Sequence, residues 1–159
     1  MKIISHRGNI DSINPDRENT FEYIDEAISL DFEVEIDLWR IDKELFLGHD
    51  EPETKVELPW LWYRKDSLWI HTKNSSALEY LVALNKYHDL KYFWHSVEPY
   101  ILTSNSIIWA HEFDNIESPE TCIVPLLDKE TLTATTPRRW YGVCTDFPVL
   151  CRELYKEVL

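Results

Sequence analysis

The stretch EVEIDL at residues 33–38 alternates strictly between acidic and apolar side chains. A period of two residues is typical of a β-strand, because successive side chains point to opposite faces. Glu35 and Asp37 would therefore share one face, while the apolar side chains pack on the other. A second β-rich run, at residues 2–5, begins the chain and ends at His6. The sequence thus predicts two strands, each carrying polar groups at or beyond its end.

A helix is predicted between these two strands, since Asn19 or Thr20 can cap it and apolar residues recur at helical spacing. A later helix is predicted from a capping box formed by Ser76 and Glu79, and the last helix from Pro148 as its first residue. Seven further short strands are predicted, at residues 45–47, 68–70, 91–94, 100–102, 107–110, 122–126 and 141–145.

The alternation of strands and helices in the first half favours a mostly parallel sheet of the α/β class. In the second half, the strands are separated by gaps too short for a full helix each. Residues 51–66 are an excursion rich in proline and charge, with aromatic side chains at Trp60, Trp62 and Tyr63. Because no stretch resembles a linker, residues 1–159 are expected to form a single domain.

The amino-acid composition limits which partners the protein can bind and in which cellular compartment it is expected. The 29 acidic and 16 basic side chains give a net charge of −13, which repels nucleic acids and anionic lipid surfaces. No apolar run approaches the length of a membrane span. Since only residues 1–4 precede the first polar motif, no signal peptide is expected. The three cysteines lack metal-binding spacing, so reduced thiols in a cytoplasmic protein are expected.

Glu35 and Asp37 are candidates for a metal site. Two carboxylates a few ångströms apart repel each other unless a cation lies between them, and hard oxygen ligands suit Mg²⁺ or Ca²⁺. The alternative is that this face of the strand is solvated and that the two charges are incidental.

Two histidines follow predicted strands, His6 and His49, and histidine is the side chain best suited to proton transfer near neutrality. In a parallel α/β fold the carboxyl ends of the strands gather on one side, where active sites lie. Arg7 offers a planar fork for a phosphate group, or alternatively an ion pair with an acidic neighbour. Two of only three glycines, Gly8 and Gly48, flank these histidines, which indicates special backbone geometry there.

Several motifs occur in the order found in the glycerophosphodiester phosphodiesterases, of the phospholipase C-like phosphodiesterase superfamily. They are His6-Arg7-Gly8, Glu18-Asn19-Thr20, Glu35-x-Asp37, Gly48-His49-Asp50 and Thr145-Asp146-Phe147-Pro148. Each motif is weak alone, but the ordered series is specific. The chain therefore resembles this family over its first third and near its C-terminus. The resemblance implies a TIM-type barrel and a divalent cation, with Mg²⁺ preferred and Ca²⁺ or Mn²⁺ as alternatives.

The resemblance also implies site residues. His6 and His49 would act as acid and base on a phosphodiester, while Glu35 and Asp37 hold the cation. The groups that would neutralise charge on the phosphoryl oxygens are Arg7 and Lys73. Two further positions would be supporting residues, Glu18 and Asp50; Glu18 either orients Arg7 or supports the shell around the metal.

The chain departs from the family pattern at residue 71. The family has Glu-x-Lys there, with the glutamate as a metal ligand, whereas this chain has His71-Thr72-Lys73. If His71 is the third metal ligand, the preference moves from Ca²⁺ towards Mg²⁺, Mn²⁺ or a softer transition metal. Otherwise His71 forms hydrogen bonds within the mouth of the barrel.

The chain is also short, because a TIM barrel usually needs about 200 residues or more. The expected fold is therefore a small or truncated TIM-type barrel with several helices replaced by loops. The strand-end residues Trp94, His95, Trp109, His111 and Glu112 are candidates for lining a substrate pocket, although aromatic side chains there can equally pack in the core or rim.

The expected function is that of a metal-dependent hydrolase that releases an alcohol from a glycerol phosphodiester or a related phosphate ester. Its partner is then a small-molecule phosphodiester, with no nucleic acid and no membrane insertion. An alternative is a non-catalytic barrel that binds a phosphorylated ligand or a protein partner. A third option keeps the metal but changes the bond that is cut, as in a phosphomonoesterase or a cyclising lyase.

Overall fold

The computed structural model describes the backbone of residues 1–158, with all side chains except those of residues 86 and 87. The strands are β1 (Lys2–His6), β2 (Glu33–Ile41), β3 (Glu44–Leu47), β4 (Thr54–Val56), β5 (Leu68–Thr72), β6 (Tyr92–Phe93), β7 (Tyr100–Leu102), β8 (Ile108–Ala110), β9 (Cys122–Pro125) and β10 (Gly142–Thr145). The helices are α1 (Phe21–Ser29), α2 (Leu58–Tyr63), α3 (Ser75–His88), α4 (Lys129–Ala134) and α5 (Pro148–Leu154), with a short 3₁₀ helix at Pro119–Thr121.

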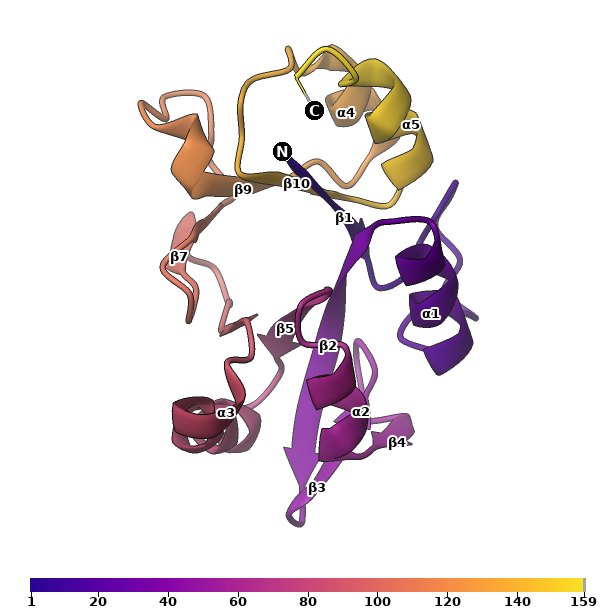
Figure 1. Ribbon diagram of the computed structural model, residues 1–159, viewed down its shortest axis with the longest axis vertical. Helices are drawn as coiled ribbons and strands as arrows, with labels where there is room; N and C mark the ends of the chain where they lie inside the picture. Colours follow the sequence, from indigo (N-terminus) through magenta and orange to yellow (C-terminus); the bar gives the residue numbers. More distant parts are fainter. Residues whose placement is uncertain (159) are drawn as a thin grey trace.

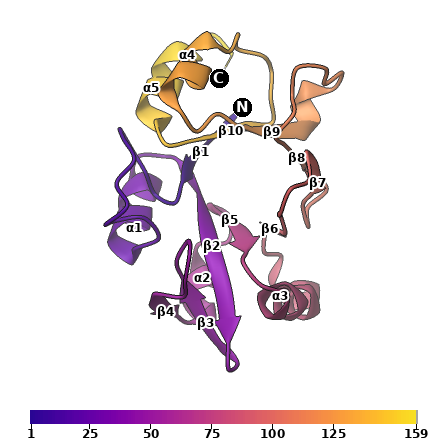
Figure 2. The same cartoon turned by 180° about the vertical axis from the view of Figure 1, so that it is seen from behind.

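Seven of these strands run parallel, in the spatial order β6, β5, β2, β1, β10, β9 and β8. They curve into a ring, with the helices outside it (Figures 1 and 2). No ladder joins β6 to β8 in the described part of the chain, and the antiparallel strand β7 occupies the edge of β8. Ser104 crosses this opening, since its backbone N–H donates to the Tyr92 carbonyl and its hydroxyl accepts from the Tyr92 N–H. The prediction of an α/β truncated barrel is confirmed.

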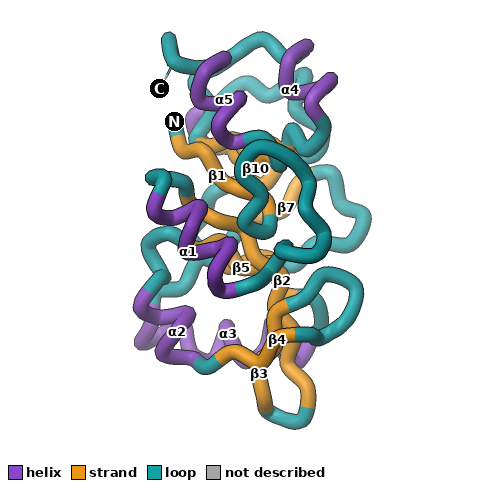
Figure 3. Tube along the Cα trace, turned by 90° about the vertical axis from the view of Figure 1, so that its right-hand side faces the viewer, coloured by secondary structure: helices purple, strands orange, loops and turns teal. Residues whose placement is uncertain are grey.

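The core has an inner and an outer part. Trp69, Phe93, Trp109 and Ile123 fill the inside of the ring, and two other clusters lie between the strands and the surrounding helices. The side view shows α1, α2, α4 and α5 flanking the strands (Figure 3). Between β6 and β9 the only helix within residues 1–158 is the 3₁₀ turn, so no α-helix covers the outside of the ring there.

Local signals explain the helix starts. Thr20, rather than Asn19, caps α1 by accepting from the Tyr23 N–H, and Pro148 begins α5 as predicted. The predicted capping box of α3 is wrong, because Asn74 is its N-cap and accepts from the Ala77 N–H.

The excursion at residues 51–66, for which no strand or helix was predicted, contains β4 and α2. The antiparallel hairpin partner β3 supplies the backbone hydrogen bonds that make β4 a strand, which no local pattern reveals. A helix of six residues such as α2 or α4 is stabilised by packing more than by its own sequence, so α4 was missed in the same way. Within residues 1–158, no helix combines the length and apolarity needed to cross a membrane.

The scarce glycines lie where the chain turns next to the predicted histidines. Gly8 has φ of +90° and Gly48 has φ of +148°, conformations that L side chains rarely adopt. A Cβ atom at Gly48 would lie 2.1 Å from the carbonyl oxygen of Glu51. The loop that presents His49 therefore requires glycine at residue 48.

Candidate functional site

One cavity of about 310 Å³ lies among the carboxyl ends of the parallel strands. Most of the residues predicted for the site line it, together with three of the strand-end aromatic residues. The lining residues that matter below are His6, Arg7, Glu35, His49, His71, Lys73, Phe93, His95, Trp109 and His111. Five of the six histidines of the chain are in this set, so segments that are distant in sequence converge here.

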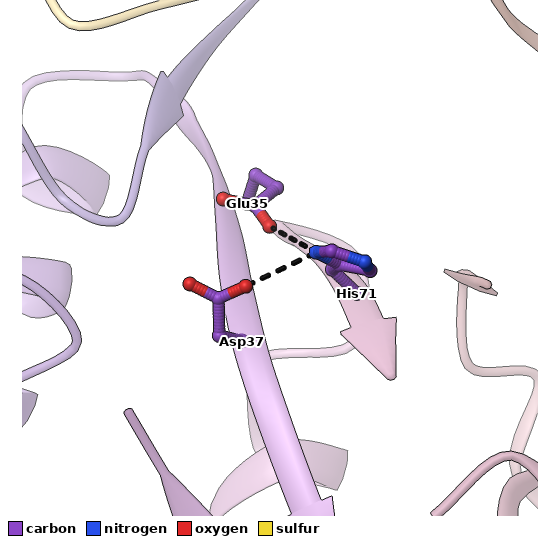
Figure 4. A group of neighbouring side chains, drawn as sticks. All are labelled: Glu35, Asp37 and His71. Carbon is purple, nitrogen blue, oxygen red and sulfur yellow. Dashed lines mark hydrogen bonds and ion pairs between the residues drawn. The ribbon is translucent and has the colours of Figure 1, made fainter. Parts of the chain in front are cut away.

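Glu35 and Asp37 on β2 and His71 on the neighbouring strand β5 form a compact group (Figure 4). One ligand atom from each lies within 4.8 Å of the others. His71 Nδ1 is 3.1 Å from Asp37 Oδ1 and 3.8 Å from Glu35 Oε1. The parallel register places Asp37 beside His71, which is why the side chains share one face.

Asp37 is surrounded by nitrogen atoms. Oδ1 faces His71 and lies 3.3 Å from Lys73 Nζ, while Oδ2 lies 3.0 Å from Arg7 Nε and accepts from Asn19 Nδ2 at 3.1 Å. Burial alone would raise the pKa of Asp37, but the His71 hydrogen bond and the Lys73 and Arg7 charges hold it well below its usual range. Asp37 is therefore a carboxylate at any working pH.

Glu35 is in the opposite situation. It is 3% exposed, and its Oε2 atom has no hydrogen-bond partner among the described residues. Burial, together with the neighbouring charge of Asp37, raises the pKa of Glu35. An orphaned, buried carboxylate oxygen beside a second carboxylate and an imidazole is an arrangement that a divalent cation would satisfy.

The second ring nitrogen of His71, Nε2, points away from the two carboxylates and has a partner of the kind found behind metal-binding histidines. Its Nε2 atom lies 3.5 Å from the backbone carbonyl oxygen of His95. A histidine that ligates a metal through one ring nitrogen commonly donates the other N–H to a carbonyl group. The donor set of Glu35, Asp37 and His71 therefore fits a cation.

His6 is hydrogen-bonded through Nδ1 to Asp146, a residue with no predicted role. His6 Nδ1 donates to Asp146 Oδ1 at 2.8 Å, and Asn9 Nδ2 donates to the same oxygen at 2.7 Å. This leaves His6 Nε2 toward Glu35, 3.9 Å from its Oε2. Burial would lower the pKa of His6, but the hydrogen bond to Asp146 and the Glu35 charge raise it above its ordinary value of 6.5.

Glu18 links the same network to Arg7. Its carboxylate accepts from Arg7 Nη1 at 3.0 Å and from Asn9 Nδ2 at 2.8 Å. Arg7 and Asn19 both have left-handed backbones, with φ of +54° and +59°, and the Asn19 N–H donates to the Arg7 carbonyl. Non-glycine residues in this region are strained, and such strain is typical of functional sites. Of the two roles left open for Glu18, the geometry favours orienting Arg7.

His49 reaches the cavity from the loop after β3 and is more exposed, at 39% of its side chain. Its Nδ1 atom lies 2.8 Å from Asp50, whose side chain is 91% exposed. Burial, followed by the charge of Arg7, lowers the pKa of His49. The two histidines thus differ, because His6 has buried carboxylate partners and His49 has only a solvated one.

Sequence reasoning assigned no role to Asn9 and Asp146, both buried, although Asp146 directly follows strand β10. The rule that selected His6, a polar residue at the end of a strand, could have selected Asp146 as well. Among the aromatic candidates, His95, Trp109 and His111 line the cavity. Trp94 and Glu112 are not among its lining residues.

A larger cavity of about 520 Å³ lies beside α4 and is lined by Phe113, Arg138 and Trp140, among others. None of the predicted site residues borders it, so the smaller cavity is the candidate site.

No family model and no curated protein sequence matches the chain. Among solved structures, the fold resembles the crystal structure of a glycerophosphodiester phosphodiesterase from Agrobacterium tumefaciens strain C58. The TM-score is 0.56 and the sequence identity 16%, over 98% of this chain and 99% of that chain. This likeness shows that the two proteins share a fold.

Proposed function

We propose that this protein is a metal-dependent phosphodiester hydrolase that acts on glycerol phosphodiesters. The observation that carries the proposal is the grouping of Glu35, Asp37 and His71, with one ligand atom from each within 4.8 Å, on the cavity that Arg7, Lys73 and the two predicted histidines line. Carboxylates for a cation, cationic groups for a phosphate and imidazoles for proton transfer are the components that this reaction requires.

In the proposed reaction, a glycerol hydroxyl attacks phosphorus and the bond to the leaving alcohol breaks. His49, with a lowered pKa and no buried carboxylate partner, accepts the proton of the attacking hydroxyl. His6, whose pKa is raised by the hydrogen bond to Asp146 and the charge of Glu35, donates a proton to the leaving alkoxide. Water then opens the cyclic phosphate, with the two histidines exchanging roles.

Arg7 and Lys73 stabilise the charge that grows on the phosphoryl oxygens, because both are fixed by Asp37 at the cavity wall. Glu35, Asp37 and His71 would hold the cation. When bound, a divalent cation supplies charge neutralisation at a phosphate oxygen and lowers the pKa of a nearby hydroxyl. We propose Mg²⁺ first, with Mn²⁺ or Ca²⁺ as alternatives.

The test is hydrolysis of a glycerophosphodiester by the purified protein with Mg²⁺, followed by phosphorus NMR. We expect glycerol phosphate to form and His6→Ala to abolish its formation. His88→Ala is the matched control, since His88 lies at the end of α3 outside the cavity lining and stacks edge-on against Trp62. Unchanged turnover in His6→Ala would exclude the acid–base role.

A second candidate function is a non-catalytic barrel that binds a phosphorylated ligand. It is favoured by the contacts of Asp37, whose two oxygens already face four nitrogen groups and therefore have partners without a cation. Calorimetry separates the two functions. The hydrolase predicts that Mg²⁺ or Mn²⁺ raises the melting temperature of the wild type but not of Glu35→Gln, whereas the binding module predicts no cation response in either.

The proposed substrate is a small, soluble phosphodiester, because the cavity is small and the surface strongly acidic. We place the protein in the cytoplasm, since the three cysteines are free and buried rather than paired. We also propose that residues 1–159 act as a single domain.

A further inference from the structure

His95 and His111 form a stacked pair on the wall of the cavity, with ring centroids 4.2 Å apart and planes inclined by 17°. His95 follows β6 and His111 follows β8, so the pair spans the side where no ladder joins these strands. The His111 N–H donates to the Pro99 carbonyl, which ties the two segments together. The pair thus completes the cavity wall where the truncated barrel is open.

The ring order places this wall across the cavity from His6. Counting from β1, strand β6 is the third neighbour in one direction and β8 is the third in the other. Arg7, Glu35 and Lys73 belong to β1, β2 and β5 or the residues just after them. A phosphate bound by those residues would therefore direct one substituent toward the stacked histidines.

The chemistry of this wall is neutral and rich in hydrogen-bonding groups. Two stacked imidazoles disfavour charge on each other, and burial followed by the charge of His95 lowers the pKa of His111 to about 4. A neutral imidazole offers one donor and one acceptor. His95 Nδ1 is buried, lies 4.0 Å from a carboxylate oxygen of Glu98 and makes no hydrogen bond among the described residues, so its hydrogen-bonding capacity is unused.

The charged groups that line the cavity do not favour a cationic ligand at this wall, and a neighbouring carboxylate, that of Glu98, is half-exposed and lies 4.0 Å from His95 Nδ1 outside the lining. Glu35 is the only carboxylate that lines the cavity within the described residues, and it belongs to the metal group. Arg7 and Lys73 add positive charge. An ammonium group placed there would lose water while facing the positive charges of Arg7 and Lys73. The rings of Phe93 and Trp109, which also line the cavity, offer flat apolar faces to the C–H groups of a carbon skeleton.

In an in-line displacement, the attacking and leaving oxygens lie on opposite sides of phosphorus. The attacking glycerol must fold back against its own phosphate, whereas the leaving alcohol extends away from it. We propose that His95 and His111 bind the leaving alcohol and select an uncharged polyol over a cationic amino alcohol. This inference rests on the proposed function and adds the class of its leaving group.

The experiment compares kcat/KM for glycerol phosphodiesters whose leaving alcohol is glycerol, inositol, ethanolamine or choline. We expect the two polyol substrates to exceed the two cationic ones by about tenfold or more, as for one or two hydrogen bonds. His95→Phe and His111→Phe keep a flat ring but remove the donor and acceptor, so each should abolish most of this preference. His88→Phe, at the matched residue outside the cavity, should keep it.

Three results would overturn the proposal. Equal or better rates with choline and ethanolamine would assign the leaving group to the neighbouring groove, where the acidic residues Glu112 and Asp114 lie beside His111. An equal loss on every substrate in the two variants would assign the pair to the retained glycerol. A preference that survives in both variants would show that other residues set it. Absence of hydrolysis with all four substrates would instead refute the proposed function itself.

Discussion

Replacing Asp146 with Asn tests the link between the buried carboxylate and His6. Asp146 is 4% exposed and accepts from both His6 Nδ1 and Asn9 Nδ2, at 2.8 and 2.7 Å. The substitution keeps the size of the side chain but removes its charge. The charge-assisted hydrogen bond to His6 then becomes neutral, and the imidazolium loses the partner that contributes most to raising its pKa.

A hydrogen bond to a charged group contributes about 1.5–3 kcal/mol. At this burial, solvent screens little of that energy, so the variant should lose roughly 10- to 150-fold in kcat/KM at pH 7. The direction of the pH effect is fixed as well. His6 must be protonated to act as the acid, and its pKa falls in Asp146→Asn, so the alkaline limb of the activity profile should move to lower pH.

The assay is a pH profile of kcat/KM, joined to an NMR titration of the His6 ring in both proteins. Asp50→Asn is the matched comparison, because it removes the carboxylate beside the other histidine, where 91% exposure leaves the ion pair screened. It should change kcat/KM by less than about threefold. If the His6 pKa is the same with and without the Asp146 charge, and turnover is retained, the positioning role of Asp146 is refuted.

Three further predictions follow from the same geometry. Because the pKa of His6 is raised in the folded protein, its interactions stabilise the fold fully below about pH 6.5 and progressively less as pH rises through its folded-state pKa. Urea unfolding should therefore show that His6→Gln lowers the free energy of unfolding more at pH 5.5 than at pH 8.5. Gly48→Ala should lower the free energy of unfolding by at least about 1–3 kcal/mol, measured by thermal denaturation, because its Cβ atom would collide with the Glu51 carbonyl at a positive φ. His71→Glu restores a third carboxylate beside Glu35 and Asp37, so calorimetry should show tighter Ca²⁺ binding relative to Mn²⁺; an unaltered ratio would remove residue 71 from the metal shell.

Much of the fold could be predicted because its strands carry their own pattern. The alternation at residues 33–38 appears in β2 with Val34, Ile36 and Leu38 fully buried. The elements that were missed, β4, α2 and α4, have no such signal. Each is short and forms because a partner covers it, as Leu61 of α2 and Leu132 of α4 are each covered in a core cluster.

The candidate site shows the same division between local and tertiary information. Strand ends located His6 and His49, the alternation within one strand located Glu35 and Asp37, and the family pattern located His71. The contacts between them required the fold. Asn9 hydrogen-bonds to Asp146, 137 residues away, and no spacing in the sequence indicates that pair. The same holds for the stacked His95 and His111, whose approach depends on the missing ladder between β6 and β8.

The position of the opening explains how a shortened barrel can keep a complete set of polar groups. The strands that carry Arg7, Glu35, Asp37 and His71 are β1, β2 and β5, which pair with one another in continuous parallel register and are flanked by α1, α2 and α3. Strands β6 to β8, between which the described residues contain no α-helix, contribute only the opposite wall. Because the proposed phosphate-binding side and the far wall belong to separate strands, we expect changes in the far wall to alter which alcohol fits without moving the groups proposed to act on phosphorus.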